Sequence, residues 1–145
     1  MSVVNTSQRQ KIVIVNTGCA NISSVRFALE RLGVEVDVSD DVNVIKNADK
    51  VFLPGVGTAA AAMASIKQKA LVETLQSLTQ PVLGVCLGMQ LMVETSAEGG
   101  FQGTGNIDCL NLMPGHVARM ESKGVRLPHM GWNTIKKDID HHVSN

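Results

Sequence analysis

Hydrophobic residues in the first part of the chain gather in four short runs, separated by longer segments in which they recur at helical spacing. Runs of this length, rich in β-branched residues and bounded by turn-forming residues, are typical of buried strands. We therefore predict four strands, at residues 11–16, 34–38, 50–53 and 81–85. The third is expected to end at Pro54, because proline interrupts the hydrogen bonding of a strand.

Apart from a polar segment with Asp40 and Asp41 after the second run, the segments between these runs predict helices. The first has Asn21 or Ser23 available as its N-terminal cap and Gly33 placed to end it. Residues 59–78 are helical in composition and are expected to form two pieces, and a last helix is expected at residues 87–95. The apolar positions of the first helix are Ile22, Val25, Ala28, Leu29 and Leu32.

The alternation of strands and helices predicts the fold class. Each helix must cross back over the sheet before the next strand can pair, so the strands run parallel. We predict an α/β fold with a doubly wound, mostly parallel, flavodoxin-like sheet, and one domain at residues 11–145 after a disordered leader at residues 1–10. Antiparallel edge strands are expected near the C-terminus, at residues 109–112, 117–120 and 134–135.

Composition and charge exclude several classes of function. The 145 residues carry 13 Lys+Arg against 13 Asp+Glu, and aromatic residues make up only 3%, so neither phosphate tracking nor base stacking is expected. No apolar run approaches the ~18 residues of a membrane span, and the N-terminal segment lacks the basic start and apolar core of a signal peptide. We therefore expect a cytoplasmic protein.

The cysteines and histidines give no sign of a disulfide framework or a metal site. The three cysteines are widely spaced and odd in number, and the four histidines have no metal-ligand spacing. We expect free thiols and no metal ion. The residues concerned are Cys19, Cys86, Cys109, His116, His129, His141 and His142, of which the last two are expected to be solvated tail residues.

The most informative stretch is LGVCLGMQ at residues 83–90, where Cys86 stands between Gly84 and Gly88 as a strand gives way to a helix. This pattern is typical of a nucleophile elbow, in which the turn strains the central residue and glycines remove Cβ atoms that would clash. N–H groups at the start of the helix favour the thiolate, and the N–H of Leu87 points to where an oxyanion would form. Taken alone, the pentapeptide fits a buried strand cysteine as well.

A second special loop, Pro54-Gly55-Val56-Gly57, follows the neighbouring predicted strand. Parallel strands deliver their C-terminal loops to one edge of the sheet, so this loop and the elbow are expected to meet. A glycine-flanked peptide there can turn an N–H toward the substrate oxygen and complete an oxyanion hole. A simple Pro-Gly turn is the alternative interpretation.

These two motifs and the segment PHMGWN at residues 128–133 resemble class I glutamine amidotransferases. The last segment is similar to the signature of the glutaminase subunits of imidazole glycerol phosphate synthase, which belong to histidine biosynthesis. The similarity runs from about Lys11 to Asn133, and the three motifs occur in the family's order.

The resemblance implies a catalytic role for each residue of the two loops. Cys86 would attack the side-chain amide of glutamine, while Leu87 and the peptide between Val56 and Gly57 would supply the oxyanion donors. Gly55, together with Gly57, would leave room for the glutamine. The resemblance implies no cofactor.

The resemblance also implies that Gln90 and Glu98 hold the α-amino acid end of the substrate. Gln90 comes one helical turn after the cysteine. From the residues alone, the alternative interpretation is that Gln90 is a solvated helix residue and Glu98 an ordinary loop carboxylate.

A partner follows from the same resemblance, namely a (β/α)8-barrel cyclase subunit that receives the ammonia. His129 and Trp132 are expected at that interface, although a lone tryptophan without the family context is more often a core residue. The loop with Asn16, Gly18 and Asn21 would also face the partner. It departs from the family, which usually has an aromatic residue and paired glycines there.

A further departure concerns the catalytic base. A cysteine glutaminase of this kind uses a His-x-Glu pair on a later strand and loop, and this chain contains no His-x-Glu. We therefore expect a chain truncated at its C-terminal end, with an incomplete domain.

The sequence thus predicts a glutaminase that converts glutamine to glutamate and ammonia through a thioester on Cys86, for use by the cyclase. Two alternatives stay open. One is a catalytically inactive, glutaminase-like binding domain, and the other is the glutaminase of a different amidotransferase pathway.

Overall fold

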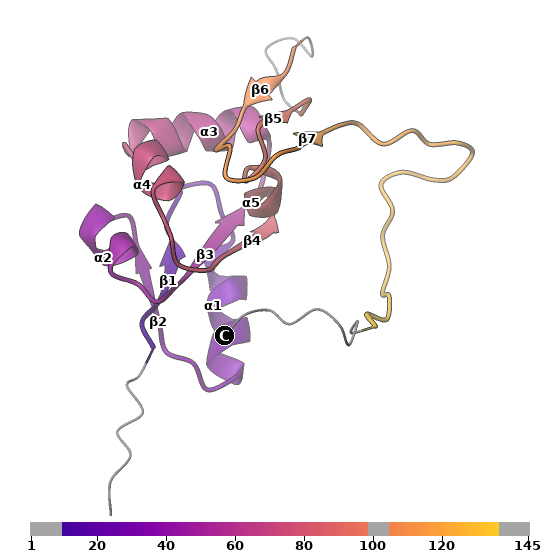
Figure 1. The fold of residues 1–145 in the computed structure, drawn as a ribbon. Coiled ribbons are helices and arrows are strands. Elements are labelled where there is room, and N and C mark those ends of the chain that lie inside the picture. Colours follow the sequence, from indigo (N-terminus) through magenta and orange to yellow (C-terminus); the bar gives the residue numbers. More distant parts are fainter. Residues whose placement is uncertain (1–9, 99–104, 137–145) are drawn as a thin grey trace, which may run out of the picture.

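Four parallel strands form the main sheet in the order β2-β1-β3-β4 (Figure 1). The computed structural model describes residues 10–98 and 105–136. The predicted leader at residues 1–10, apart from Gln10, and the tail histidines therefore lie outside the described residues. The strands are β1 (Ile12–Val15), β2 (Val36–Ser39), β3 (Lys50–Gly55) and β4 (Val82–Cys86).

Helices connect these strands in the predicted alternation, and they are α1 (Ile22–Arg31), α2 (Val42–Lys46), α3 (Ala59–Gln68), α4 (Val72–Gln76) and α5 (Leu87–Gln90). The step from β1 to β2 runs in one direction across the sheet and the step from β3 to β4 in the other. Because such crossovers are right-handed, α1 lies on the opposite face from α3 and α4. The predicted doubly wound α/β architecture is confirmed.

The core fills the space between the sheet and α2, α3 and α4. Alternate strand residues point into it, because side chains of a strand alternate between the two faces. The other face carries Ile14, which is fully buried, and Leu29 of α1 is buried as well. The principal core residues are Val13, Val15, Ile45, Val51, Leu53, Ala62, Met63, Ile66, Leu71 and Leu75.

The helix α2 is not among the predicted helices, because it lies in the polar segment that begins with Asp40 and Asp41. Asp41 caps it, since its carboxylate accepts hydrogen bonds from the N–H groups of Asn43 (2.7 Å) and Val44 (3.1 Å). Ile45 is the buried residue of this helix. A capping aspartate followed by an apolar residue one turn later is the signal that would have identified it.

The strand β3 is longer than predicted, because it continues through Pro54 to Gly55. The N–H of Val51 donates to Pro81 on the β4 side, whereas that of Lys50 donates to Lys11 on the β1 side. This alternation places position 54 on the β1 side, where pairing ends at Phe52. The proline therefore costs the sheet no hydrogen bond.

The helix α5 is shorter than predicted, because it ends at Gln90 instead of Thr95. The carbonyl groups that would continue the helix accept hydrogen bonds from a distant segment instead. Leu110 donates to Leu91 (2.9 Å) and Leu112 donates to Met92 (2.8 Å). These contacts also explain why residues 109–112 do not form the expected strand.

The expected edge strands form a small separate sheet in place of an extension of the main one. Its order is β6-β5-β7, with β5 at Thr95–Ser96, β6 at Ile107–Asp108 and β7 at His116–Val117. The strand β6 pairs antiparallel to β5, as expected, but β7 pairs parallel to it. The expected strand at residues 134–135 is absent from the described part of the chain.

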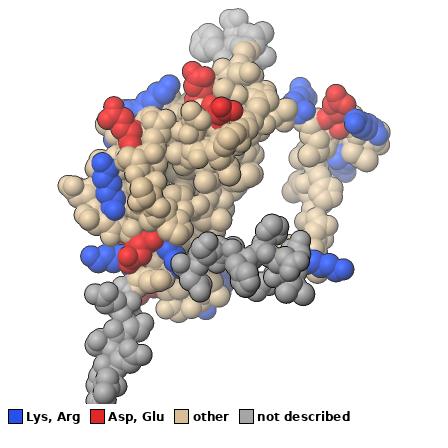
Figure 2. Space-filling model, viewed as in Figure 1, with Lys and Arg blue, Asp and Glu red and all other residues tan. Residues whose placement is uncertain are grey.

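Residues 120–136 extend away from the α/β body (Figure 1). Their recorded hydrogen bonds and ion pairs are local, namely Val125 with Ser122 and Lys123 with Glu121. In Figure 2, acidic and basic side chains are interspersed on the visible face, in keeping with the zero net charge. Within residues 10–98 and 105–136, no helix has the length and apolarity that crossing a membrane would require.

Candidate active site

Cys86 is the last residue of β4 and the N-terminal cap of α5, so it lies where the strand turns into the helix. Its backbone adopts φ +54° and ψ −120°, a conformation that residues with side chains rarely adopt. The residue is exposed. The structure therefore contradicts the alternative of a buried strand cysteine and has the strained turn of a nucleophile elbow.

Close backbone packing explains the two glycines that flank the cysteine. A Cβ at Gly84 would lie 2.4 Å from the Cα of Met89, and a Cβ at Gly88 would lie 1.7 Å from the carbonyl oxygen of Leu53. Both distances are far below van der Waals contact, so only glycine fits at either position. The turn at Cys86 is thus fixed by contacts with β3 and α5.

The proline-glycine loop lies directly beside the elbow. In the pairing of β3 with β4, Gly55 is the partner of Cys86. A Cβ at Gly55 would come within 2.8 Å of the backbone nitrogen of Gly88, so the loop and the helix α5 approach as closely as their backbones allow. The sequence expectation that the two loops meet at one sheet edge agrees with this register.

Two backbone N–H groups of the proline-glycine loop differ in whether they already donate a hydrogen bond. The N–H of Val56 donates to the carbonyl oxygen of Cys19 (2.9 Å), which leaves the N–H of Gly57 as the candidate donor of that peptide. Within the described residues no hydrogen bond from Gly57 is recorded, and its φ of +90° is one that glycine adopts without strain. Leu87 begins α5, so its N–H belongs to the first turn, where N–H groups have no acceptor within the helix.

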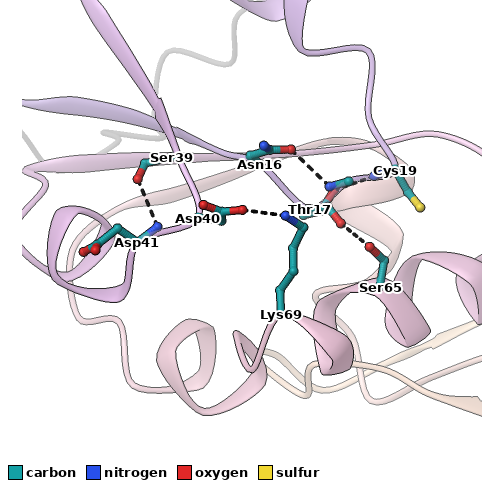
Figure 3. A network of polar contacts seen from close by, with 9 residues as sticks. Asn16, Thr17, Cys19, Ser39, Asp40, Asp41, Ser65 and Lys69 are labelled. Atoms are coloured by element: carbon teal, nitrogen blue, oxygen red, sulfur yellow. Dashed lines mark hydrogen bonds and ion pairs between the residues drawn. The ribbon is translucent and has the colours of Figure 1, made fainter.

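The loop after β1 is held against the same edge of the sheet. Its own side chains fold it, because Asn16 accepts a hydrogen bond from the N–H of Gly18 (3.2 Å) and Asn21 caps α1. The hydroxyl of Ser65 on α3 donates to the carbonyl oxygen of Thr17 (2.6 Å), as Figure 3 shows. This loop is therefore anchored to both the body and the proline-glycine loop.

An ion pair lies beside this network. The ammonium of Lys69 binds the carboxylate of Asp40 at 2.5 Å, on the surface near the end of β2 (Figure 3). The hydrogen bond from Lys69, and secondly its positive charge, hold the pKa of Asp40 below its usual value. The pair contributes to the surface around the site and does not contact Cys86 in the recorded interactions.

A cavity of about 340 Å³ is lined by Gln90, the last residue of α5, and by Glu98. The two residues expected to bind the substrate therefore share one cavity. Gln90 is half-buried and Glu98 is exposed. Arg119 lines the same cavity, and sequence reasoning missed it because it belongs to none of the three motifs.

The other two cysteines differ from Cys86 in exposure. Cys109 is buried, and this burial, with a smaller contribution from the charge of Asp108, raises the pKa of its thiol. Cys19 is half-buried. No group of three or more histidine, cysteine or acidic residues is arranged to hold a metal ion in the described part of the chain.

The structure does not bring the residues of the PHMGWN segment to the elbow. Trp132 is fully exposed, which contradicts its alternative interpretation as a core residue, and His129 is exposed too. Asn16, Gly18 and Asn21 lie instead at the sheet edge. The five residues expected to face a partner thus fall into two separate regions of the described structure.

The match to a protein-family model gives the class of this site. The model described as "Glutamine amidotransferase class-I" matches residues 13–144. Because this range includes the elbow, the proline-glycine loop and most of the chain, the protein belongs to the class I glutamine amidotransferase family.

The curated relatives give a closer likeness. "Imidazole glycerol phosphate synthase subunit HisH" of Idiomarina loihiensis is 56% identical over 129 residues, which cover 89% of this chain and 63% of the relative. The proteins of the same name from Colwellia psychrerythraea and Haemophilus influenzae are 55% identical over 142 residues (92% and 63%) and 54% identical over 125 residues (86% and 60%). The chain thus spans less than two thirds of the length of these relatives.

Proposed function

We propose that the chain is a glutaminase with Cys86 as its nucleophile, which supplies ammonia to imidazole glycerol phosphate synthase in histidine biosynthesis. The observation that carries the proposal is the exposed, strained Cys86 paired directly with Gly55. The likeness to relatives named as HisH subunits of that synthase supports the pathway.

The reaction runs through a covalent intermediate. The thiolate of Cys86 attacks the carbonyl carbon of the glutamine side chain, and the carbonyl oxygen becomes an oxyanion. Collapse of this tetrahedral intermediate breaks the carbon–nitrogen bond, and the nitrogen leaves as ammonia after accepting, through solvent, the proton that the Cys86 thiol lost on ionising. Water then attacks the thioester, which releases glutamate and restores the thiol.

The surrounding residues have separate roles in this proposal. The N–H groups of Leu87 and Gly57 stabilise the oxyanion, where each donor in such a site is worth about 2.7–4 kcal/mol. Gly55 leaves space for the glutamine side chain, and Gln90 and Glu98 bind its α-amino acid end. The opening of the cavity next to α5 supports this arrangement.

The proposed partner is a (β/α)8-barrel cyclase subunit in the cytoplasm, which receives the ammonia. Asn16, Gly18 and Asn21 would contact it at the sheet edge. His129 and Trp132 would contact it from the extended segment, where the exposed indole offers a large apolar anchor.

A non-catalytic function is the second candidate, and one observation favours it. The chain has no His-x-Glu, so it contains no pair that would move protons for Cys86 in the way the family does. In that case the chain would keep the glutamine pocket and the partner surface without turnover.

Glutamine hydrolysis, measured with and without the cyclase subunit, tests the proposal. The proposed function requires ammonia release that disappears in Cys86→Ala and persists in the matched variant Cys19→Ala. If glutamine protects Cys86 from alkylation but no ammonia forms with or without the cyclase subunit, the binding function is correct. Ammonia release that survives in Cys86→Ala would contradict the thioester mechanism.

A further inference from the structure

The cavity beside α5 is lined by side chains of opposite charge, which reach it from two different strands. Glu98 follows β5 and Arg119 follows β7. These strands pair in parallel, with Ser96 opposite Val117, and the N–H of Ala97 continues the pairing by donating to Val117 (2.8 Å). The same register carried two residues onward places Glu98 opposite Arg119.

Despite this placement, no bond between the two charged side chains is recorded. Among the described residues, neither the carboxylate of Glu98 nor the guanidinium of Arg119 has an ion pair or a side-chain hydrogen bond. Elsewhere on the surface, Arg26 with Glu30 and Lys69 with Asp40 do form such pairs. The two charges at the cavity are therefore available to a ligand.

A free α-amino acid needs both charges, because it carries an ammonium and a carboxylate on the same carbon. The cavity offers a carboxylate at Glu98, a guanidinium at Arg119 and an amide at Gln90, and the apolar residue Val117 also lines it. A guanidinium binds a carboxylate through two parallel N–H donors, which fixes the orientation of the ligand as well as its charge.

We propose that Arg119 binds the α-carboxylate of the glutamine substrate and so selects the free amino acid over glutamine whose carboxyl is in amide linkage. The inference rests on the proposed function and adds a specificity-determining residue to it. Glu98 binds the ammonium in this arrangement. The side chain of the ligand then extends past Gln90, one turn of α5 beyond Cys86, toward the thiol.

The test measures how well two ligands protect Cys86 in the full chain. The probe is the chloroketone analogue of glutamine, whose chloride is displaced by the thiolate, and labelling is followed by intact mass. Glutamine and its α-amide, glutaminamide, are compared as competitors. In the unmodified chain, glutamine is expected to protect at a concentration about tenfold lower than glutaminamide, because only glutamine has the carboxylate.

Arg119→Ala is expected to remove this tenfold preference, because it weakens the protection of Cys86 by glutamine and leaves the protection by glutaminamide unchanged. Arg119→Lys keeps the charge and should restore most of the preference. Arg126→Ala is the matched control, because Arg126 lines a different cavity. Labelling by iodoacetamide, which has no amino acid group, should be equal in all variants.

Two results would overturn the proposal, and they are distinguishable. If Arg119→Ala keeps the preference, or weakens both competitors equally, the guanidinium does not bind the carboxylate, although the proposed function stands. If glutamine does not protect Cys86 in the unmodified chain, the proposed function itself fails and this inference fails with it.

Discussion

The elbow and the extended segment at residues 120–136 both carry sequence motifs, but the structure positions them very differently. At the elbow, backbones of β3, β4 and α5 approach so closely that single Cβ atoms would not fit at Gly84 or Gly88. The extended segment has only local bonds, and its Trp132 is fully exposed. The α/β body therefore fixes the geometry of the nucleophile. The PHMGWN motif at residues 128–133, in contrast, is not held by contacts with that body in the described structure.

Matched glycine substitutions give the largest expected contrast between the two regions. Gly88→Ala should destabilise the fold by about 3 kcal/mol or more, because the new Cβ would lie 1.7 Å from the oxygen of Leu53. Gly131→Ala is the control, since nothing lies within 4 Å of its Cβ position. Urea unfolding measures both, and equal losses would contradict the contrast.

Strain at Cys86 gives a smaller effect. Glycine adopts its φ of +54° without strain, so Cys86→Gly should be more stable than Cys86→Ala by about 1 kcal/mol. The comparison of these two variants removes the contribution of the thiol. At Cys109, which is buried in ordinary backbone, the order should reverse because glycine loses the packing of the Cβ. A more stable Cys86→Ala would show that the turn is unstrained.

The ion pair of Lys69 with Asp40 should give a small, pH-dependent effect. Because the folded-state pKa of Asp40 lies below its usual value of 3.8, the pair stabilises the fold above that pH and ceases to do so as the pH falls through the folded pKa. The difference in urea midpoint between the unmodified chain and Asp40→Asn should shrink below pH 3.8. It should also shrink in high salt, since the pair is exposed. A difference that grows on acidification would contradict the sign.

The smallest effect on folding is expected in the extended segment. Trp132→Ala should change the free energy of unfolding by less than about 0.5 kcal/mol, because the side chain is fully exposed. The same variant should weaken binding of the cyclase subunit by about 2 kcal/mol if the indole is an interface anchor. Calorimetric titration measures the binding. Unchanged affinity would remove Trp132 from the proposed interface.

The sequence was sufficient for the main sheet and the elbow because both depend on local signals. Alternation of apolar runs and helical segments gave the parallel strands, and the glycines around Cys86 gave the turn. The predicted end of β3 at Pro54 was wrong. Whether a proline breaks a strand depends on whether its missing N–H would face a paired neighbouring strand, and the sequence does not show this.

The second sheet and the cavity could not be predicted in the same way. The end of α5 depends on hydrogen bonds from residues 110–112 to carbonyl groups about twenty residues earlier. The helical periodicity of the sequence does not indicate such long-range bonds. Arg119 reaches the cavity through the parallel pairing of two-residue strands, β5 and β7, which are too short to have a sequence pattern. Long-range pairing of this kind appears only in the folded structure.

The most direct test of the central claim is to map which cysteine reacts with the chloroketone analogue of glutamine, by mass spectrometry of the digested chain. Modification should be confined to Cys86, because it is exposed at the elbow beside Gly55, whereas the pKa of the buried Cys109 thiol is raised. Added glutamine should prevent it. Equal modification of Cys19, Cys86 and Cys109, unaffected by glutamine, would contradict the claim.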